Sequence, residues 1–94
     1  MVYELKALPK FLRQFGKFSP ADQNRVREEL RKIAADPSAG HVKKGPLAGI
    51  RVHKWKLKHQ LYLIAYETDK KAKTIFIYAL STHEGFYKAL QRYV

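Results

Sequence analysis

The sequence predicts a small α+β domain with the element order β-α-α-β-β-β-α, a mostly antiparallel sheet and a helical hairpin on one sheet face. Two apolar stripes at helical spacing, each preceded by a proline, lie before residue 37. Three segments between residues 50 and 80 have the alternating or continuous apolar character of strands, and polar turns separate them at hairpin spacing. A chain of 94 residues is expected to form one domain, residues 1–94, around one core.

The first half of the chain predicts a short strand and two helices. Residues 1–6 alternate polar and apolar side chains, which is typical of a strand with one covered face. Pro9 suits the first turn of a helix that ends at Gly16. Its apolar side is expected to comprise Leu8, Phe11, Leu12 and Phe15.

A second helix is predicted to begin at Ser19, whose hydroxyl can cap it, and to end at Asp36 because a proline follows. Its expected core stripe is Val26, Leu30, Ile33 and Ala34. The charged residues that largely surround this stripe are Arg25, Arg27, Glu28, Glu29, Arg31 and Lys32.

The second half predicts a three-stranded meander. Ser38–Gly49 is rich in glycine and is expected to be a loop. The next strand extends to about Lys58. Leu61–Glu67 and Thr74–Leu80 are apolar on both faces, as central strands are. After them, Ser81 and Glu84 have capping-box spacing, so a short C-terminal helix is predicted.

The charge of the chain points to an anionic partner. The net charge is +11, and residues 41–60 hold six basic residues and three of the four histidines but no acid. Nucleic acid, an acidic protein, or both are the expected partners. The absence of cysteine excludes disulfide and thiolate chemistry. Without a membrane-spanning stretch or a signal-peptide core, the protein is expected to be cytoplasmic.

Three lysines occur at alternate positions of the first meander strand. Because strand residues alternate between faces, Lys54, Lys56 and Lys58 are expected to share one face. The opposite face then carries a half-buried His53, a core Trp55 and Leu57. A row of like charges repels itself and favours an anionic ligand, although a merely solvated basic face is the alternative. Lys70, Lys71 and Lys73 belong to a hairpin turn, where solvated charge is expected.

Three short motifs, in this order along the chain, suggest a family. They are a basic loop ending Pro46-Leu47-Ala48-Gly49, a strand Lys54-Trp55-Lys56-Leu57 and a strand with tyrosines at its ends, Tyr62–Tyr66. Together with the element order they resemble the RelE/ParE superfamily of bacterial type II toxin–antitoxin toxins. The resemblance implies a ribosome-dependent endoribonuclease that cleaves mRNA, inhibits translation and is held inactive by an acidic antitoxin.

The resemblance also suggests site residues. Lys54 and Lys56 look like the catalytic strand lysines, and Thr82-His83…Tyr87 looks like the ending of the histidine-using branch. RelE itself has an arginine where this chain has Leu63. If the chemistry is retained, the arginine's role must fall to another base, and the candidates are Arg51, Lys58 and His59. Lys43 and Lys44 on the preceding loop are expected to contact RNA with them.

Lysine, histidine and tyrosine can supply all the groups that RNA cleavage without metal requires: a base, a cation for the phosphate and an acid. Lys54, Lys56, His83 and Tyr87 are therefore the predicted catalytic residues, expected to converge on one concave basic surface. A polar first-turn position without a role remains open for His83, and packing on the sheet for Tyr87. No metal-ligand cluster or phosphate loop occurs in the sequence, so no metal or cofactor is expected.

Two other functions remain open. A ParE-like toxin binds DNA gyrase and cleaves nothing, and the same scaffold serves both activities. A plain RNA-binding module would need only the basic face. The gathering of possible acid–base groups around Lys54 and Lys56 favours the nuclease.

Overall fold

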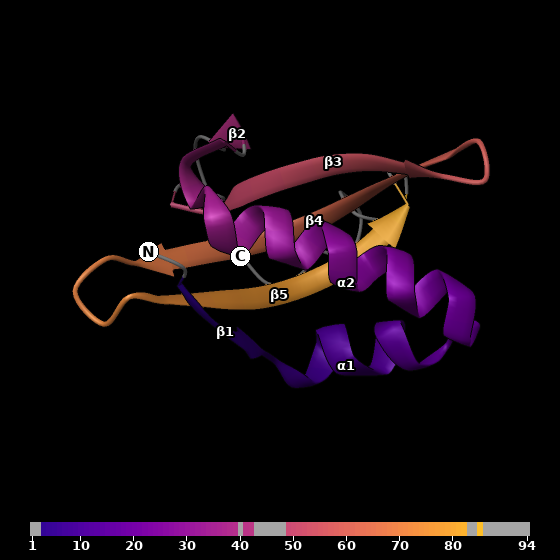
Figure 1. Ribbon diagram of the computed structural model, residues 1–94, viewed down its shortest axis with the longest axis horizontal. Coiled ribbons are helices and arrows are strands. Elements are labelled where there is room, and N and C mark those ends of the chain that lie inside the picture. Colours follow the sequence, from indigo (N-terminus) through magenta and orange to yellow (C-terminus); the bar gives the residue numbers. More distant parts are fainter. Residues whose placement is uncertain (1–2, 40, 43–48, 83–84, 86–94) are drawn as a thin grey trace.

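The computed structural model describes residues 3–39, 41–42, 49–82 and 85. Its mixed sheet has the strand order β1-β5-β4-β3-β2, with two helices packed on one face (Figure 1). The elements are β1 (Glu4–Ala7), α1 (Pro9–Gly16), α2 (Pro20–Ala35), the 3₁₀ helix η1 (Pro37–Ala39), β2 (His41–Val42), β3 (Arg51–Leu57), β4 (Gln60–Asp69) and β5 (Thr74–Thr82). Strands β3, β4 and β5 form the predicted antiparallel meander, while β1 pairs in parallel with β5. The predicted α+β fold is confirmed.

Both helices begin where the sequence predicts. Pro9 and Pro20 occupy first-turn positions, and the Ser19 hydroxyl accepts a hydrogen bond from the backbone N–H of Asp22 at 3.3 Å. One predicted core position is wrong. Leu12 is 52% exposed, because α1 turns Phe11 rather than Leu12 into the core.

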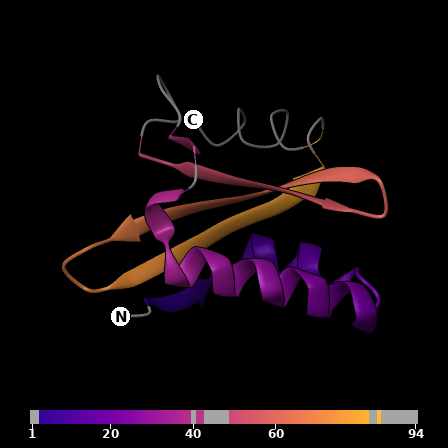
Figure 2. The same ribbon diagram turned by 45° about the horizontal axis from the view of Figure 1, so that its top comes forward.

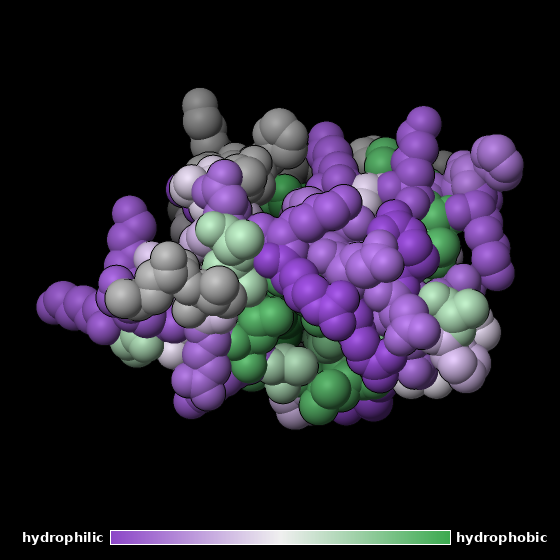
Figure 3. Space-filling view, viewed as in Figure 1, coloured by the Kyte–Doolittle hydropathy of each residue, from purple (hydrophilic) through white to green (hydrophobic). Residues whose placement is uncertain are grey.

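The main core lies between the helices and the sheet. Val26 and Ile33 of α2 pack with Trp55 of β3 and with apolar residues of β4 and β5. Figure 2, a view tilted relative to Figure 1, shows α1 and α2 on the same side of the sheet. Polar side chains cover the outside of α2 in Figure 3, and apolar side chains reach the surface below it. None of the helices in the described part of the chain is long and apolar enough to cross a membrane.

A second apolar cluster lies on the opposite face of the sheet. It consists of the buried residues Val52, Leu63, Ala65 and Ala79, with Ile50 and Tyr78 packed against them. The predicted central strands β4 and β5 therefore bury residues on both faces, which explains their continuous apolar character.

The structure corrects several predicted boundaries. The predicted loop Ser38–Gly49 contains part of η1 and the two-residue strand β2, which pairs with Arg51 and Val52. The first strand begins at Glu4 within the described residues. Ser81, the predicted cap of the last helix, is part of β5. The Thr82 hydroxyl instead accepts from the backbone N–H of Gly85 at 3.2 Å, so the capping pattern starts one residue later. The remainder of the predicted C-terminal helix lies outside the described residues.

Candidate functional site on the lysine face

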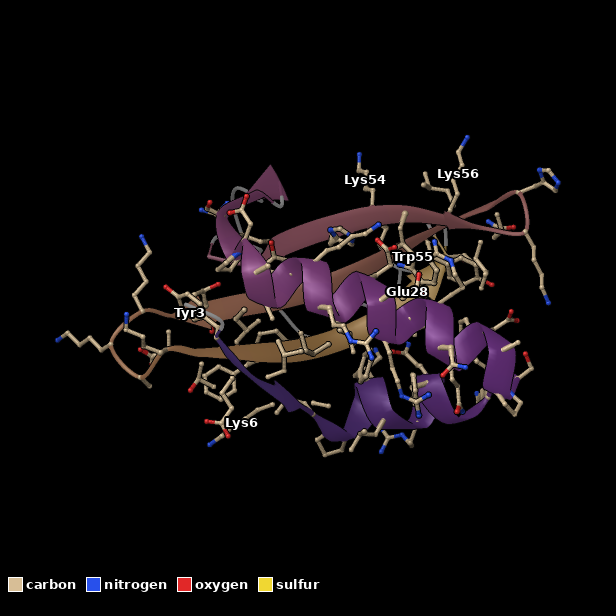
Figure 4. All side chains as sticks on the ribbon, in the orientation of Figure 1. Tyr3, Lys6, Glu28, Lys54, Trp55 and Lys56 are labelled. Carbon is tan, nitrogen blue, oxygen red and sulfur yellow. The ribbon has the colours of Figure 1, made fainter. Side chains whose placement is uncertain are left out.

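Lys54 and Lys56 lie side by side on the sheet face opposite α1 and α2, here called the lysine face. Both are exposed, and they alternate with the buried Trp55 and Leu57 on the helix side of β3. Figure 4 shows the two lysine side chains pointing the same way, away from α2. Two strand residues span about 6.8 Å, so two ammonium groups at this spacing can contact neighbouring phosphates or two oxygens of one phosphate.

Apolar residues of β4 lie next to the two lysines on the same sheet face. Lys54 pairs across the strands with Leu63, and Lys56 pairs with Leu61. Leu63 is 0% exposed and belongs to the second apolar cluster. The position at which RelE carries an arginine is therefore filled in this chain by a buried apolar side chain next to Lys54. Among the described residues, β4 therefore presents no charged side chain at this position.

Lys58 does not continue the lysine row, contrary to the sequence prediction. Strand β3 ends at Leu57, and Lys58 is the first residue of the turn, with φ at 50°. Its Nζ lies 3.2 Å from Oδ2 of Asp22 in the first turn of α2. The turn rotates the side chain away from the alternation of the strand, so only two of the three lysines share the face.

Arg51 faces the helix side of the sheet and not the lysine face. It shares its side of β3 with His53 and Trp55, and its Nη1 donates to the carbonyl of Ser38 at 3.1 Å. Arg51 therefore does not share the face of Lys54 and Lys56, and its contact with RNA stays a prediction. His59 is exposed at the tip of the β3–β4 turn.

A buried carboxylate on α2 contacts β3 on the face opposite the lysines. The Glu29 side chain is 3% exposed, and its Oε1 lies 2.7 Å from Nε2 of His53. Its Oε2 accepts hydrogen bonds from Lys32 at 3.0 Å and Arg25 at 3.1 Å. Glu29 was expected among the charged residues around the core stripe of α2, but it is buried. The half-buried position predicted for His53 and the core position predicted for Trp55 are confirmed.

The contacts of Glu29 favour its charged form. Burial by itself would raise the pKa of this carboxyl, but hydrogen bonds from His53, Lys32 and Arg25 and the charge of Lys32 outweigh burial and lower the pKa. Three contacts join α2 to β3 and the turn that follows it. They are the Glu29–His53 pair, the Lys58–Asp22 ion pair and the Arg25 guanidinium, which lies 5.7 Å from the centre of the Trp55 ring. Charged contacts thus stabilise β3 on its helix face, while Lys54 and Lys56 lie on its other face.

A tyrosine–glutamate pair on the lysine face was missed in the sequence. The Tyr78 hydroxyl donates to Oε1 of Glu67 at 2.9 Å. Burial raises the pKa of Tyr78, and the hydrogen bond and charge of Glu67 raise it further. The pair forms where the register shifts between Ala65 and Tyr66 of β4. Such a bulge has no sequence signal here, so the neighbours could not be predicted.

Several predicted site residues lie outside the described residues: His83, Tyr87, Lys43 and Lys44. The convergence of Lys54, Lys56 and His83 on one concave surface therefore stays a prediction. Lys70, Lys71 and Lys73 are exposed in the β4–β5 turn, as predicted, at the end of the sheet remote from the β3–β4 turn.

The class of protein follows from a comparison with family models. The model described as the ParE-like toxin of type II bacterial toxin–antitoxin systems matches residues 5–91. Because this range is nearly the whole chain, the protein belongs to that toxin family. No curated protein sequence matches it.

Solved structures show the same fold. The RelBE2 toxin–antitoxin complex of Mycobacterium tuberculosis has a chain that matches 88% of this one and 100% of its own length, with a TM-score of 0.77 and 19% identity. A mutant of the Escherichia coli toxin RelE in the free state matches over 100% of both chains, with a TM-score of 0.71 and 18% identity. The archaeal RelE–RelB complex of Pyrococcus horikoshii OT3 matches 87% of this chain and 96% of its own, with a TM-score of 0.61 and 21% identity. These likenesses, at 21% identity or less, show that the chain shares the fold of the RelE structures.

Proposed function

We propose that this toxin is a metal-independent, ribosome-dependent endoribonuclease that cleaves mRNA and thereby inhibits translation. The observation that carries the proposal is the exposed pair Lys54 and Lys56 on one side of a strand that α2 fastens from behind. Ammonium groups fixed on a rigid strand can stabilise the charge that develops on a phosphate without rearranging during the reaction.

The proposed reaction transfers the phosphodiester to the neighbouring 2′-oxygen. A base removes the proton of the ribose 2′-hydroxyl, the oxygen attacks phosphorus, and the bond to the 5′-oxygen breaks as an acid protonates it. Lys54 and Lys56 neutralise the phosphate oxygens, and either is also a candidate for the base. We propose His83 and Tyr87 for the acid and for positioning of the substrate, and Lys43 and Lys44 for attraction to RNA.

We further propose that a cognate acidic antitoxin neutralises the toxin in the cytoplasm, where ribosomes and mRNA are found. The net charge of +11 favours an acidic partner, and RelB accompanies the toxin in the Mycobacterium tuberculosis and Pyrococcus horikoshii structures. The whole chain, residues 1–94, is proposed to act as one domain.

One observation favours a second candidate function. The apolar, buried Leu63 beside Lys54 leaves the lysine face without the arginine of RelE. A ParE-like toxin that binds DNA gyrase needs no cleavage chemistry, and its family is the one matched by residues 5–91. The lysines would then serve only as a basic contact surface or protect the edge of β3, which β2 covers at Arg51 and Val52 among the described strands.

The deciding experiment replaces Lys54 or Lys56 with alanine and measures single-turnover mRNA cleavage on ribosomes. Loss of one group that stabilises the developing charge is expected to slow cleavage about 10²–10³-fold, equivalent to about 2.7–4 kcal/mol. Lys70→Ala and Lys71→Ala remove the same charge from the remote turn and are expected to lower only the general attraction to RNA. Saturating toxin separates slow chemistry from weak binding.

Lys54→Glu keeps a charge on the edge strand but repels phosphate, so a fully active glutamate variant would point to edge protection alone. Equal, small losses for all four alanine variants would contradict the catalytic role. Mapping mRNA 5′ ends in cells that express the toxin, beside markers of DNA damage, then distinguishes the two functions. New 5′ ends without DNA damage support the nuclease, whereas DNA damage without new 5′ ends supports the gyrase-binding toxin.

A further inference from the structure

The β3–β4 turn has a backbone conformation that its two residues disfavour. Leu57 and Gln60 pair across the hairpin, so Lys58 and His59 form a two-residue loop. Their φ angles are 50° and 69°. Positive φ at both loop positions is the type I′ turn, in which Asn-Gly is preferred because a side chain with a Cβ crowds the backbone there. A turn selected only for its shape would use those residues.

Both residues of this turn carry exposed basic side chains. The Lys58 side chain is 73% exposed, and its Nζ lies 3.2 Å from the carboxylate of Asp22, whose side chain is 18% exposed. Because the lysine end of this pair is exposed, salt screens the contact and a phosphate can compete with the carboxylate for the ammonium group. His59 is exposed beside it.

The tip lies next to the lysine face in the chain, because Lys58 follows Lys56 by two residues, although its side chain turns toward Asp22 of α2. From Lys54 to Leu57, the last residue of β3, the chain advances by three residues, which is about 10 Å at the rise of a strand. A single nucleic-acid strand carries several phosphates over that length, since stacked nucleotides repeat about every 3.4 Å. A nucleic-acid strand that reaches Lys54 and Lys56 can therefore extend past the end of β3 to the exposed tip.

We propose that Lys58 and His59 form a contact site for the nucleic-acid phosphate backbone, and that the disfavoured turn is retained because it presents these side chains. The proposal deepens the proposed function, since it supplies a second anchor for the RNA strand that reaches Lys54 and Lys56. Strained backbone that persists against the residue preference is a feature of functional sites. The bound chemistry is the phosphodiester, which RNA and DNA share.

The β4–β5 turn provides a matched control. Lys73 is also an exposed lysine with positive φ, at 53°, but it lies at the other end of the sheet. Lys58→Asn and Lys73→Asn therefore remove the same charge and relieve the same backbone conformation. The double variant Lys58→Asn/His59→Gly converts the tip to the preferred type I′ sequence.

The test measures thermal unfolding and affinity together. The probes are a short fluorescent single-stranded RNA with 2′-O-methyl riboses, which cannot be cleaved, a DNA strand of the same sequence, and polyglutamate. The double variant is expected to melt about 4–8 °C higher than the parent. It is also expected to bind both nucleic acids about 3–10-fold more weakly, with a salt slope reduced by about 0.7–1.4. Lys73→Asn is expected to melt higher and to bind within about twofold of the parent.

Unchanged nucleic-acid affinity in the double variant would overturn the site, as would equal losses for Lys58→Asn and Lys73→Asn. Weaker binding of polyglutamate alone would assign the tip to an acidic protein instead. A melting temperature that does not rise would overturn the claim that the turn is retained although its residues disfavour this conformation.

The binding assay needs no cleavage, so it separates the contact site from the catalytic proposal. A tip variant with weakened RNA binding, together with a fully active Lys54→Ala, would refute the catalytic proposal while the contact site stands. Weaker binding to DNA and RNA alike identifies the backbone as the ligand, and a loss confined to one of them would contradict a shared phosphate contact.

Discussion

Replacing Glu29 with alanine is expected to destabilise this toxin by about 2–3 kcal/mol, a large part of the stability of a small domain. Three groups contact its buried carboxylate: His53 at 2.7 Å, Lys32 at 3.0 Å and Arg25 at 3.1 Å. The alanine variant leaves these groups without their shared acceptor. The perturbation therefore tests whether charge fastens β3 to α2.

The magnitude follows from how exposed each partner is. His53 is only 19% exposed at its side chain, and a hydrogen bond to a charged group in such a setting contributes about 1.5–3 kcal/mol. Arg25 and Lys32 are 38% and 63% exposed, so each contributes about 0.3–0.5 kcal/mol on the helix surface. Arg25 also keeps its contact with Glu28 at 2.9 Å, which limits its loss.

The effect depends on pH in a defined direction. The pKa of Glu29 is lowered from its ordinary value of 4.5, so the folded state favours the carboxylate. This stabilisation is complete above the unfolded-state pKa and is lost as the pH falls through the lower folded-state pKa. A Glu29→Gln variant cannot ionise, and its disadvantage relative to the parent is expected to shrink as the pH falls below about 4.5.

Urea unfolding followed by circular dichroism at several pH values measures both effects. Thermal melting should fall by about 10–20 °C in Glu29→Ala at neutral pH. Glu28→Ala is the matched control, because its carboxylate is 55% exposed and contacts Arg25 alone among the described residues, so a loss near or below about 0.5 kcal/mol is expected. Equal losses of stability in the two alanine variants would contradict a stabilising role for the buried Glu29 carboxylate. So would a difference in stability between the parent and Glu29→Gln that is the same at acidic and neutral pH.

Two further predictions concern local contacts. Ser19→Ala removes the cap of α2 and is expected to cost about 0.5–1 kcal/mol in urea unfolding, since its bond to Asp22 is long at 3.3 Å and exposed. Ser19→Asp, which can also cap, should recover most of that loss, and an alanine variant as stable as the parent would contradict the cap. Tyr66→Phe removes the 2.7 Å hydrogen bond from the buried tyrosine hydroxyl to the carbonyl of Pro37 and should cost about 1 kcal/mol. Unchanged unfolding of the phenylalanine variant would mean that this contact does not hold η1 against the sheet.

Local sequence signals determined the elements and their faces. Pro9 and Ser19 mark the two helix starts. Pro9 has no backbone N–H that would lack a partner in the first turn, and the Ser19 hydroxyl accepts a hydrogen bond from a first-turn N–H. The alternation along β3 put Trp55 in the core and Lys54 and Lys56 outside it, since strand geometry alone assigns neighbouring residues to opposite faces. These signals act over a few residues, so one sequence suffices to interpret them.

The tertiary structure decided which residues meet across the chain. Glu29 and His53 are 24 positions apart, and nothing local distinguishes a glutamate that will be buried from its exposed neighbour Glu28. The register shift in β4 likewise brings Tyr78 to Glu67, and only the paired strands define that neighbourhood.

Only some features of the lysine face could be predicted from the sequence. The alternation of β3 was sufficient for Lys54 and Lys56, but it failed at Lys58, where closing the hairpin required positive φ and ended the strand. The sequence by itself therefore determined which side chains the strand presents. Only the packed sheet decided that Leu63 is buried beside Lys54 and that Arg51 faces the helices, because both outcomes depend on which strands pair and in which register.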